Sequence, residues 1–158
     1  RIQKQWHETV AIHHPQMKKE EMDTHIKERL KLFGIADDEA LRKYPHQLSG
    51  GMKQRIAIAM ALEPDYQILI ADEPSTSLDA VNQRNIVNFI KELCEKKKLT
   101  LLYISHNLAL LDAISTHAAT VKDGEIIEKG TREDVFHSPK NPYTRKMIRE
   151  TMELTYEK

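Results

Sequence analysis

Apolar residues recur every three or four positions through residues 1–46, a spacing typical of helices that bury one face. The first helix is expected to end at Pro15, whose ring blocks further helix. A second helix is predicted over residues 18–33, with Gly34 as its stop, and Asp37 is a candidate N-cap for a short third one. The faces expected to be buried are Ile2, Trp6, Val10 and His13 in the first helix and Met22, Ile26, Leu30 and Phe33 in the second.

In the rest of the chain, short continuous apolar runs predict strands. Residues 67–71 form one run, as expected of a parallel strand buried on both faces, and residues 99–104 form another. Two further runs flank Asp123-Gly124, a strong hairpin signal. The helices expected around these strands cover about residues 51–62 and 80–97, a short stretch capped by Thr131, and the end of the chain. The alternation predicts an α/β fold.

Ser49, Gly50 and Gly51 stand directly before the helix expected at about residue 51. Glycines give the backbone a freedom that lets neighbouring N–H groups point outward together. A helix start also presents unpaired N–H groups and the positive end of the dipole to an anion. The segment therefore suits a phosphate, although by itself it is better explained as a turn before a helix.

Two carboxylates, Asp72 and Glu73, close the first predicted strand, and His106 follows the second. Ligands of open parallel sheets gather beyond the carboxyl ends of the strands. One carboxylate can hold magnesium while its neighbour orients an attacking water, as in phosphoryl transfer. A lone histidine in this place is more often structural, but it can contact a terminal phosphate if the two strands are neighbours. Asp79 is a candidate N-cap for the helix over residues 80–97.

These residues resemble four ordered motifs of ATP-binding-cassette (ABC) ATPases. LSGGMKQR resembles the signature motif, ILIADEP the Walker B strand with its following glutamate, Ser77-Leu78-Asp79 the D-loop, and Ser105-His106 the switch histidine. PHQLSGGMKQRIAIAMAL and the NPYT tail are similar to the ATPase subunits of oligopeptide, dipeptide and nickel importers. Asn107 departs from the aspartate common after the switch histidine. The resemblance implies an α/β P-loop NTPase nucleotide-binding domain with an α-helical subdomain.

The resemblance also implies a role for single residues. Ser49, Gly50 and Gly51 would contact the γ-phosphate of ATP bound on a partner subunit, and Asp79 would lie at the subunit interface. On the chain's own nucleotide, Asp72 would help to hold Mg²⁺, Glu73 would polarise the water and His106 would contact the γ-phosphate.

The P-loop pattern GxxxxGK[ST] does not occur in the sequence. An incomplete domain is therefore predicted, with a helical subdomain at residues 1–47, the second half of the ATPase core at 48–137 and a C-terminal extension at 138–158. Without the P-loop amides and lysine, most contacts to the β- and γ-phosphates are missing, so this chain alone is expected to be inactive. A sheet without its first half is also expected to expose apolar surface and to self-associate.

Bulk properties narrow the remaining choices. Lys and Arg total 24, equal to Asp and Glu, so no strong field points to nucleic acid or an anionic bilayer. The single Cys94 excludes an internal disulfide and fits a reducing compartment. His7, His13 and His14 lie near one helix end, but without accompanying carboxylates or cysteines they are expected to be solvated or core residues rather than metal ligands.

The favoured function is that of an importer ATPase subunit, peripheral at the cytoplasmic face of the membrane. Its expected partners are a second ABC ATPase subunit in a homo- or heterodimer, integral membrane permeases and, indirectly, a solute-binding protein, with no nucleic acid. Two alternatives remain: a soluble ABC-type ATPase that acts on nucleic acid or ribosomes, and a non-catalytic assembly module.

Overall fold

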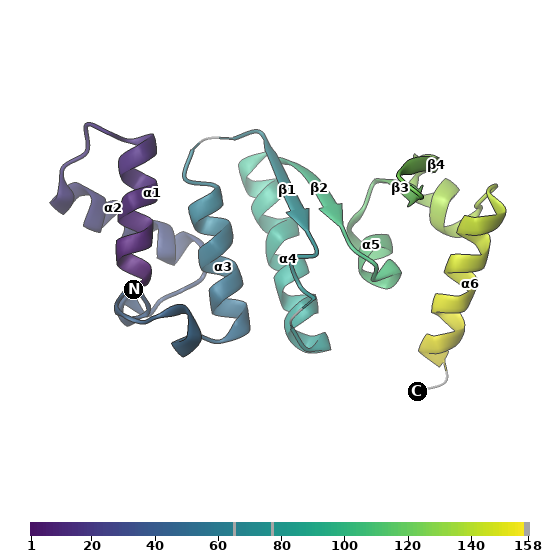
Figure 1. Cartoon of the computed structure of the whole chain (residues 1–158), viewed down its shortest axis with the longest axis horizontal. Helices are drawn as coiled ribbons and strands as arrows, with labels where there is room; N and C mark the ends of the chain where they lie inside the picture. The colour runs from purple at the N-terminus through teal and green to yellow at the C-terminus, as the bar shows by residue number, and fades with distance from the viewer. Residues whose placement is uncertain (65, 77, 157–158) are drawn as a thin grey trace. The chain divides into compact units, whose positions relative to one another are not determined.

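The computed structural model describes residues 1–64, 66–76 and 78–156, and side chains as far as residue 151 (Figure 1). Ser77 of the expected D-loop and the last two residues of the expected C-terminal extension lie outside this description. The chain forms two compact units, Arg1–Leu102 and Tyr103–Lys158, which are treated separately below. Among the described residues no helix combines the length and the apolar character needed to cross a bilayer.

The first unit begins with helices α1 (Ile2–His13) and α2 (Lys19–Leu32), followed by the short 3-10 helices η1 (Asp38–Arg42) and η2 (Pro45–Gln47). The predicted stop at Gly34 is confirmed, with φ at +73°, and the Asp37 side chain caps η1 by accepting from the amide of Glu39. The helix faces are buried largely as predicted, and α1 packs on α2 and η1. Two residues differ from the prediction: His13 is exposed to solvent and Met22 is half-buried.

The same unit continues with α3 (Gly50–Ala61), β1 (Ile68–Asp72), α4 (Ala80–Lys97) and the start of β2 (Thr100–Ile104). The two strands are neighbours in a two-stranded sheet, and the amide of Thr100 donates to the carbonyl of Gln67 at 2.8 Å. This bond joins the first residue of β2 to the residue before β1, so the strands run parallel. On the inner side of α4, Cys94 is buried as predicted.

The prediction that β1 is buried on both faces is wrong. Leu69 and Ala71 are buried, whereas Ile68 and Ile70 are 58% and 64% exposed. Alternate side chains of a strand point to opposite faces, so one face of the sheet is covered and the other is open to solvent. A continuous apolar strand is buried on both faces only when a layer of the protein packs on each face of the sheet. The described residues form a layer on one face of this sheet.

The second unit contains α5 (Leu108–Ile114), β3 (His117–Lys122), β4 (Glu125–Thr131), the short π-helical turn η3 (Glu133–His137) and α6 (Pro142–Tyr156). Strands β3 and β4 pair antiparallel from His117 opposite Thr131 to Lys122 opposite Glu125, with a bulge at Thr120/Val121. Asp123 and Gly124 have φ of +50° and +82°, which confirms the predicted hairpin turn. The hydroxyl of Thr131 accepts from the amide of Asp134, but the N-cap of η3 is Arg132, one residue later than predicted, because Thr131 is the last residue of β4.

Candidate functional site

Helix α3 begins at the Ser-Gly-Gly segment, as predicted. Ser49 is the N-cap, and its hydroxyl oxygen accepts a hydrogen bond from the amide of Met52 at 3.3 Å. The reason expected for the glycines is wrong, however. The glycines with positive φ in the described chain are Gly34 and Gly124, so neither Gly50 nor Gly51 uses the left-handed region that glycine opens.

Close packing explains Gly50 instead. A Cβ atom on Gly50 would lie 2.5 Å from Cδ2 of Leu78, well inside van der Waals contact. At Gly51 the nearest atom to such a Cβ is Oδ1 of Asn82, at an ordinary 3.9 Å. The signature segment and the D-loop therefore touch directly within the first unit, and Gly50 is the position at which they meet.

Asp79 caps helix α4, as the sequence predicts. Its carboxylate accepts from the amides of Val81 and Asn82 at 3.1 and 2.9 Å and from Nδ2 of Asn82 at 2.6 Å. The backbone hydrogen bond from Asn82 and the side-chain bond from the same residue hold the pKa of Asp79 below its usual value. The carboxylate thus fixes the end of the D-loop to the first turn of α4.

An open cleft of about 420 Å³ lies beside these two loops, between the start of α3, the start of α4 and residues 34–37. Ser49, Gly51 and Asn82 line it. Arg55 also lines the cleft, but its Nη1 donates to the carbonyl of Phe33 and its guanidinium lies 4.1 Å from the ring centre of Phe89. Arg55 therefore joins α3 to the end of α2 and to α4 from the wall of the cleft.

The two candidate carboxylates lie at the end of β1, in the same unit. Asp72 is exposed. Glu73 has a φ of +44°, rare for a residue with a side chain, and its carboxylate accepts from the Thr76 hydroxyl at 2.6 Å. Strained backbone of this kind concentrates at functional sites.

His106 lies in the second unit, exposed, between β2 and α5. The next residue, Asn107, is the N-cap of α5, and its side-chain oxygen accepts from the amide of Leu110 at 3.3 Å. Asparagine and aspartate cap helices about equally well, so the departure from the family's aspartate leaves this local structure intact. The candidate residues in the first unit are Ser49, Gly50, Gly51, Asp72, Glu73 and Asp79, with His106 in the second.

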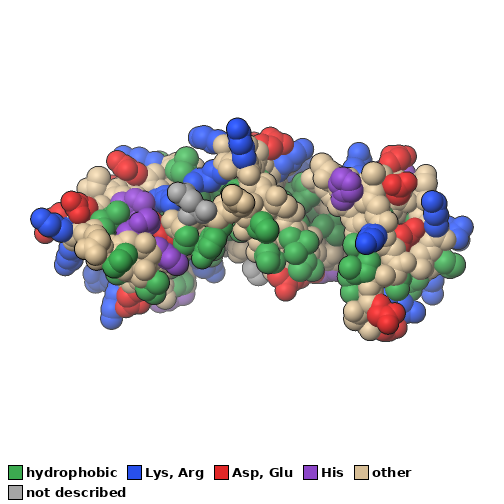
Figure 2. Space-filling view, turned by 90° about the horizontal axis from the view of Figure 1, so that it is seen from above, with side chains coloured by type: hydrophobic (Ala, Val, Ile, Leu, Met, Phe, Trp, Pro, Cys, Tyr) green, Lys and Arg blue, Asp and Glu red, His purple; other side chains and the backbone are tan. Residues whose placement is uncertain are grey.

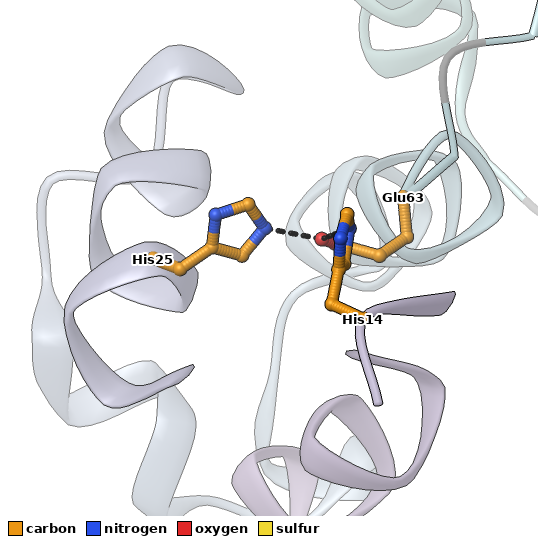
Figure 3. A group of neighbouring side chains, drawn as sticks. All are labelled: His14, His25 and Glu63. Carbon is orange, nitrogen blue, oxygen red and sulfur yellow. Dashed lines mark hydrogen bonds and ion pairs between the residues drawn. The ribbon is translucent and has the colours of Figure 1, made fainter. Parts of the chain in front are cut away.

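The structure also assembles a group that sequence reasoning missed, formed by His14, His25 and Glu63 (Figure 3). Of the three N-terminal histidines, His7 pairs with Asp23 at 2.8 Å and His13 faces solvent. His14 instead lies beside His25 and Glu63, which are distant in the sequence, so local spacing does not predict the group. The feature of the sequence that could have indicated this group is Glu63, a single acidic residue at the end of an apolar helix.

The mixed helix and strand fold, helix α3 capped by Ser49 and its packing on Leu78 are consistent with part of an ATP-binding-cassette nucleotide-binding domain. A structural relative supports this class: the dimeric post-hydrolysis structure of the ATP-binding cassette MJ0796 bound to ADP and Pi has a TM-score of 0.61 at 30% identity, over 73% of this chain and 49% of that one. Residues 2–76 match the model of the ABC transporter family. The resemblance to this family is confirmed, and so is the fold class predicted from the sequence.

Curated relatives indicate which branch of the ABC family this chain resembles. The dipeptide transport ATP-binding protein DppD of Haemophilus influenzae is 43% identical over 143 residues, which are 90% of this chain and 43% of that protein. The oligopeptide transport ATP-binding protein AppD of Bacillus subtilis is 38% identical over 140 residues, with shares of 88% and 43%. The resemblance to peptide-importer ATPase subunits is therefore confirmed, and the chain spans less than half the length of either relative.

Proposed function

We propose that this chain is part of the ATP-binding, ATP-hydrolysing subunit of an ABC importer for peptides or nickel-type metal complexes, held at the cytoplasmic face of the membrane. The observation that carries the proposal is the contact of Gly50 with Leu78, which joins signature and D-loop beside an open cleft. The relatives named for dipeptide and oligopeptide transport support the substrate class. The activity is assigned to the longer protein that contains these residues.

In that protein the start of α3 contacts the γ-phosphate of ATP held mainly by a second ABC ATPase subunit. The first N–H groups of a helix have no partner within it, and together with the dipole they attract an anion. Ser49 is exposed and Gly51 borders the cleft, so the start of the helix is open to a phosphate from this side. Asp79, fixed by the first turn of α4, holds the D-loop at the interface between the subunits.

Asp72, Glu73 and His106 act on the subunit's own nucleotide. The exposed carboxylate of Asp72 is an oxygen donor of the kind that Mg²⁺ prefers. Bound Mg²⁺ neutralises charge on the phosphates. Glu73 orients the attacking water and takes its proton, with the Thr76 hydroxyl fixing one carboxylate oxygen. His106 donates a hydrogen bond to the γ-phosphate.

The subunit pairs with itself or a related ATPase and drives integral membrane permeases that receive solute from a binding protein. The dimeric state of the MJ0796 structure supports such pairing. The 158-residue chain carries no GxxxxGK[ST] segment, so it supplies a signature surface without turnover on its own. Tight ATP binding with magnesium-dependent hydrolysis by residues 1–158 alone would contradict this part of the proposal.

The decisive test uses the full-length protein. Glu73→Gln is expected to keep nucleotide binding and to abolish steady-state ATP hydrolysis, because the amide cannot accept the proton of water. Glu28→Gln on the exposed side of α2 makes the same change of charge away from the site and is expected to hydrolyse normally. Undiminished hydrolysis by Glu73→Gln would overturn the assignment of the base.

A further inference from the structure

A buried carboxylate at the end of α3 faces two histidines from other segments (Figure 3). Glu63 is 1% exposed, and its Oε2 accepts from the indole Nε1 of Trp6 at 3.0 Å. Its Oε1 contacts Nε2 of His25 and lies 3.6 Å from Nε2 of His14. One oxygen is thus held by a neutral donor, and the other is directed at two imidazole nitrogens.

The His14 ring is the unexplained member of this group. Its Nε2 is buried and has no hydrogen-bond partner within the described part of the chain. Buried polar atoms in folded proteins are nearly always satisfied, so an orphaned nitrogen that points at a carboxylate oxygen indicates a missing partner between them. Figure 2 shows histidine side chains gathered on the N-terminal helices.

We propose that His14, His25 and Glu63 bind a divalent transition-metal ion of the zinc class. The three donor atoms lie within 4.8 Å of one another. In a tetrahedral zinc site, bonds of about 2.1 Å place neighbouring donors roughly 3.4 Å apart. The 3.6 Å between His14 and Glu63 matches this spacing, and the closer His25 nitrogen must move away from the carboxylate to admit the ion.

The donor set selects the kind of metal. Two imidazoles with one carboxylate suit zinc, nickel or copper, whereas magnesium and calcium prefer sites made of oxygen alone. Three protein ligands leave a fourth position for water. An open hollow of about 460 Å³ next to His14 gives access, and the side chains of His14 and His25 are 37% and 24% exposed.

Arg29 is the cation that faces the same carboxylate. Its Nη2 donates to the backbone carbonyl of Glu63 at 2.9 Å, while its Nε stays 3.9 Å from Oε1. The guanidinium is therefore held mainly by the main chain, and Oε1 keeps a lone pair for the metal. Trp6 on the opposite oxygen fixes the carboxylate as an outer partner, a common feature of metal ligands.

The bound ion joins three segments of the first unit: the end of α1 through His14, α2 through His25, and the turn after α3 through Glu63. A ligand that binds only the folded state stabilises it in proportion to the logarithm of its concentration. At a zinc concentration about 100-fold above Kd, the Tm should rise by roughly 5–10 °C. This function is separate from ATP hydrolysis and does not rest on the proposed importer activity.

The test measures zinc binding to the EDTA-treated 158-residue chain by calorimetry, together with Tm. Substitution of Co²⁺ supplies a second readout, because four-coordinate cobalt has intense visible absorption. His14→Gln is the informative variant, since His14 Nε2 makes no hydrogen bond that the substitution could break. His13→Gln is the matched control, one residue away and exposed.

Wild type and His13→Gln are expected to bind one zinc ion, to shift Tm and to show the cobalt bands. His14→Gln is expected to weaken binding at least 10-fold and to lose the shift in Tm. Equal binding by the two variants would show that surface histidines capture the ion and would overturn the site. Absence of binding by the wild-type chain would overturn it as well.

Discussion

Replacing Trp6 by Phe tests the buried network of the first unit. Trp6 is completely buried in α1, and its Nε1 donates to Oε2 of Glu63. Phenylalanine keeps an aromatic ring in the core but removes this donor. A buried carboxylate that loses one partner costs about 1–3 kcal/mol. The smaller ring gives up apolar contact worth about 1 kcal/mol more. The free energy of unfolding should therefore fall by about 2–4 kcal/mol, a large share of the stability of an ordinary domain.

Urea denaturation followed by far-UV circular dichroism measures this change, because the substitution removes the single tryptophan that fluorescence would use. Tyr66→Phe is the control, since it also removes one polar group from an aromatic side chain, but at a position 52% exposed. A loss for Trp6→Phe no greater than that for Tyr66→Phe would show that the indole hydrogen bond contributes nothing and would refute the reasoning.

Three further predictions concern the cap of α4, the hairpin turn and the open sheet face. The amide of Asn82 holds the pKa of Asp79 below its unfolded value of about 3.9. Ionised Asp79 therefore stabilises the fold above that pH. This contribution is lost as the pH falls through the lower pKa of the folded state. Asp79→Asn still caps the helix, and urea titrations between about pH 2 and 5 should show a weaker dependence of stability on pH. Gly124→Ala places a Cβ at a φ of +82° and should lower the unfolding free energy by about 1 kcal/mol in the same assay, and an unchanged midpoint would contradict the turn. The double variant Ile68→Thr/Ile70→Thr should show less self-association in sedimentation velocity and an unchanged Tm, because both side chains are exposed. A large drop in Tm would mean that this face of the sheet is covered.

Much of the fold could be predicted where the signals are local. The helix over residues 80–97 has the bounds expected, because an aspartate cap precedes it and a strong apolar stripe follows. The hairpin turn was equally clear, since Asp-Gly is well suited to two consecutive positive φ values. Helix α5 was not predicted, because seven residues are too few to show the apolar spacing of a helix. Its local signal in the sequence is the N-cap Asn107.

Long-range features were beyond local patterns. The open face of β1 depends on which layers the chain supplies, and the need for Gly50 depends on Leu78, 28 positions later in the sequence. The cluster around Glu63 joins residues separated by 38 or more positions from either histidine. For the candidate nucleotide site, the sequence supplied the residues, but their roles come from resemblance. Those roles and the predicted domain boundaries remain predictions.

The contact between Gly50 and Leu78 has a mechanical consequence. Cδ2 of Leu78 occupies the place that a Cβ of residue 50 would take, so the two loops are closely packed at this point. Asp79, clamped to the first turn of α4, passes the same constraint on to an 18-residue helix. A displacement of the start of α3 towards this loop therefore requires the Leu78 side chain to move as well.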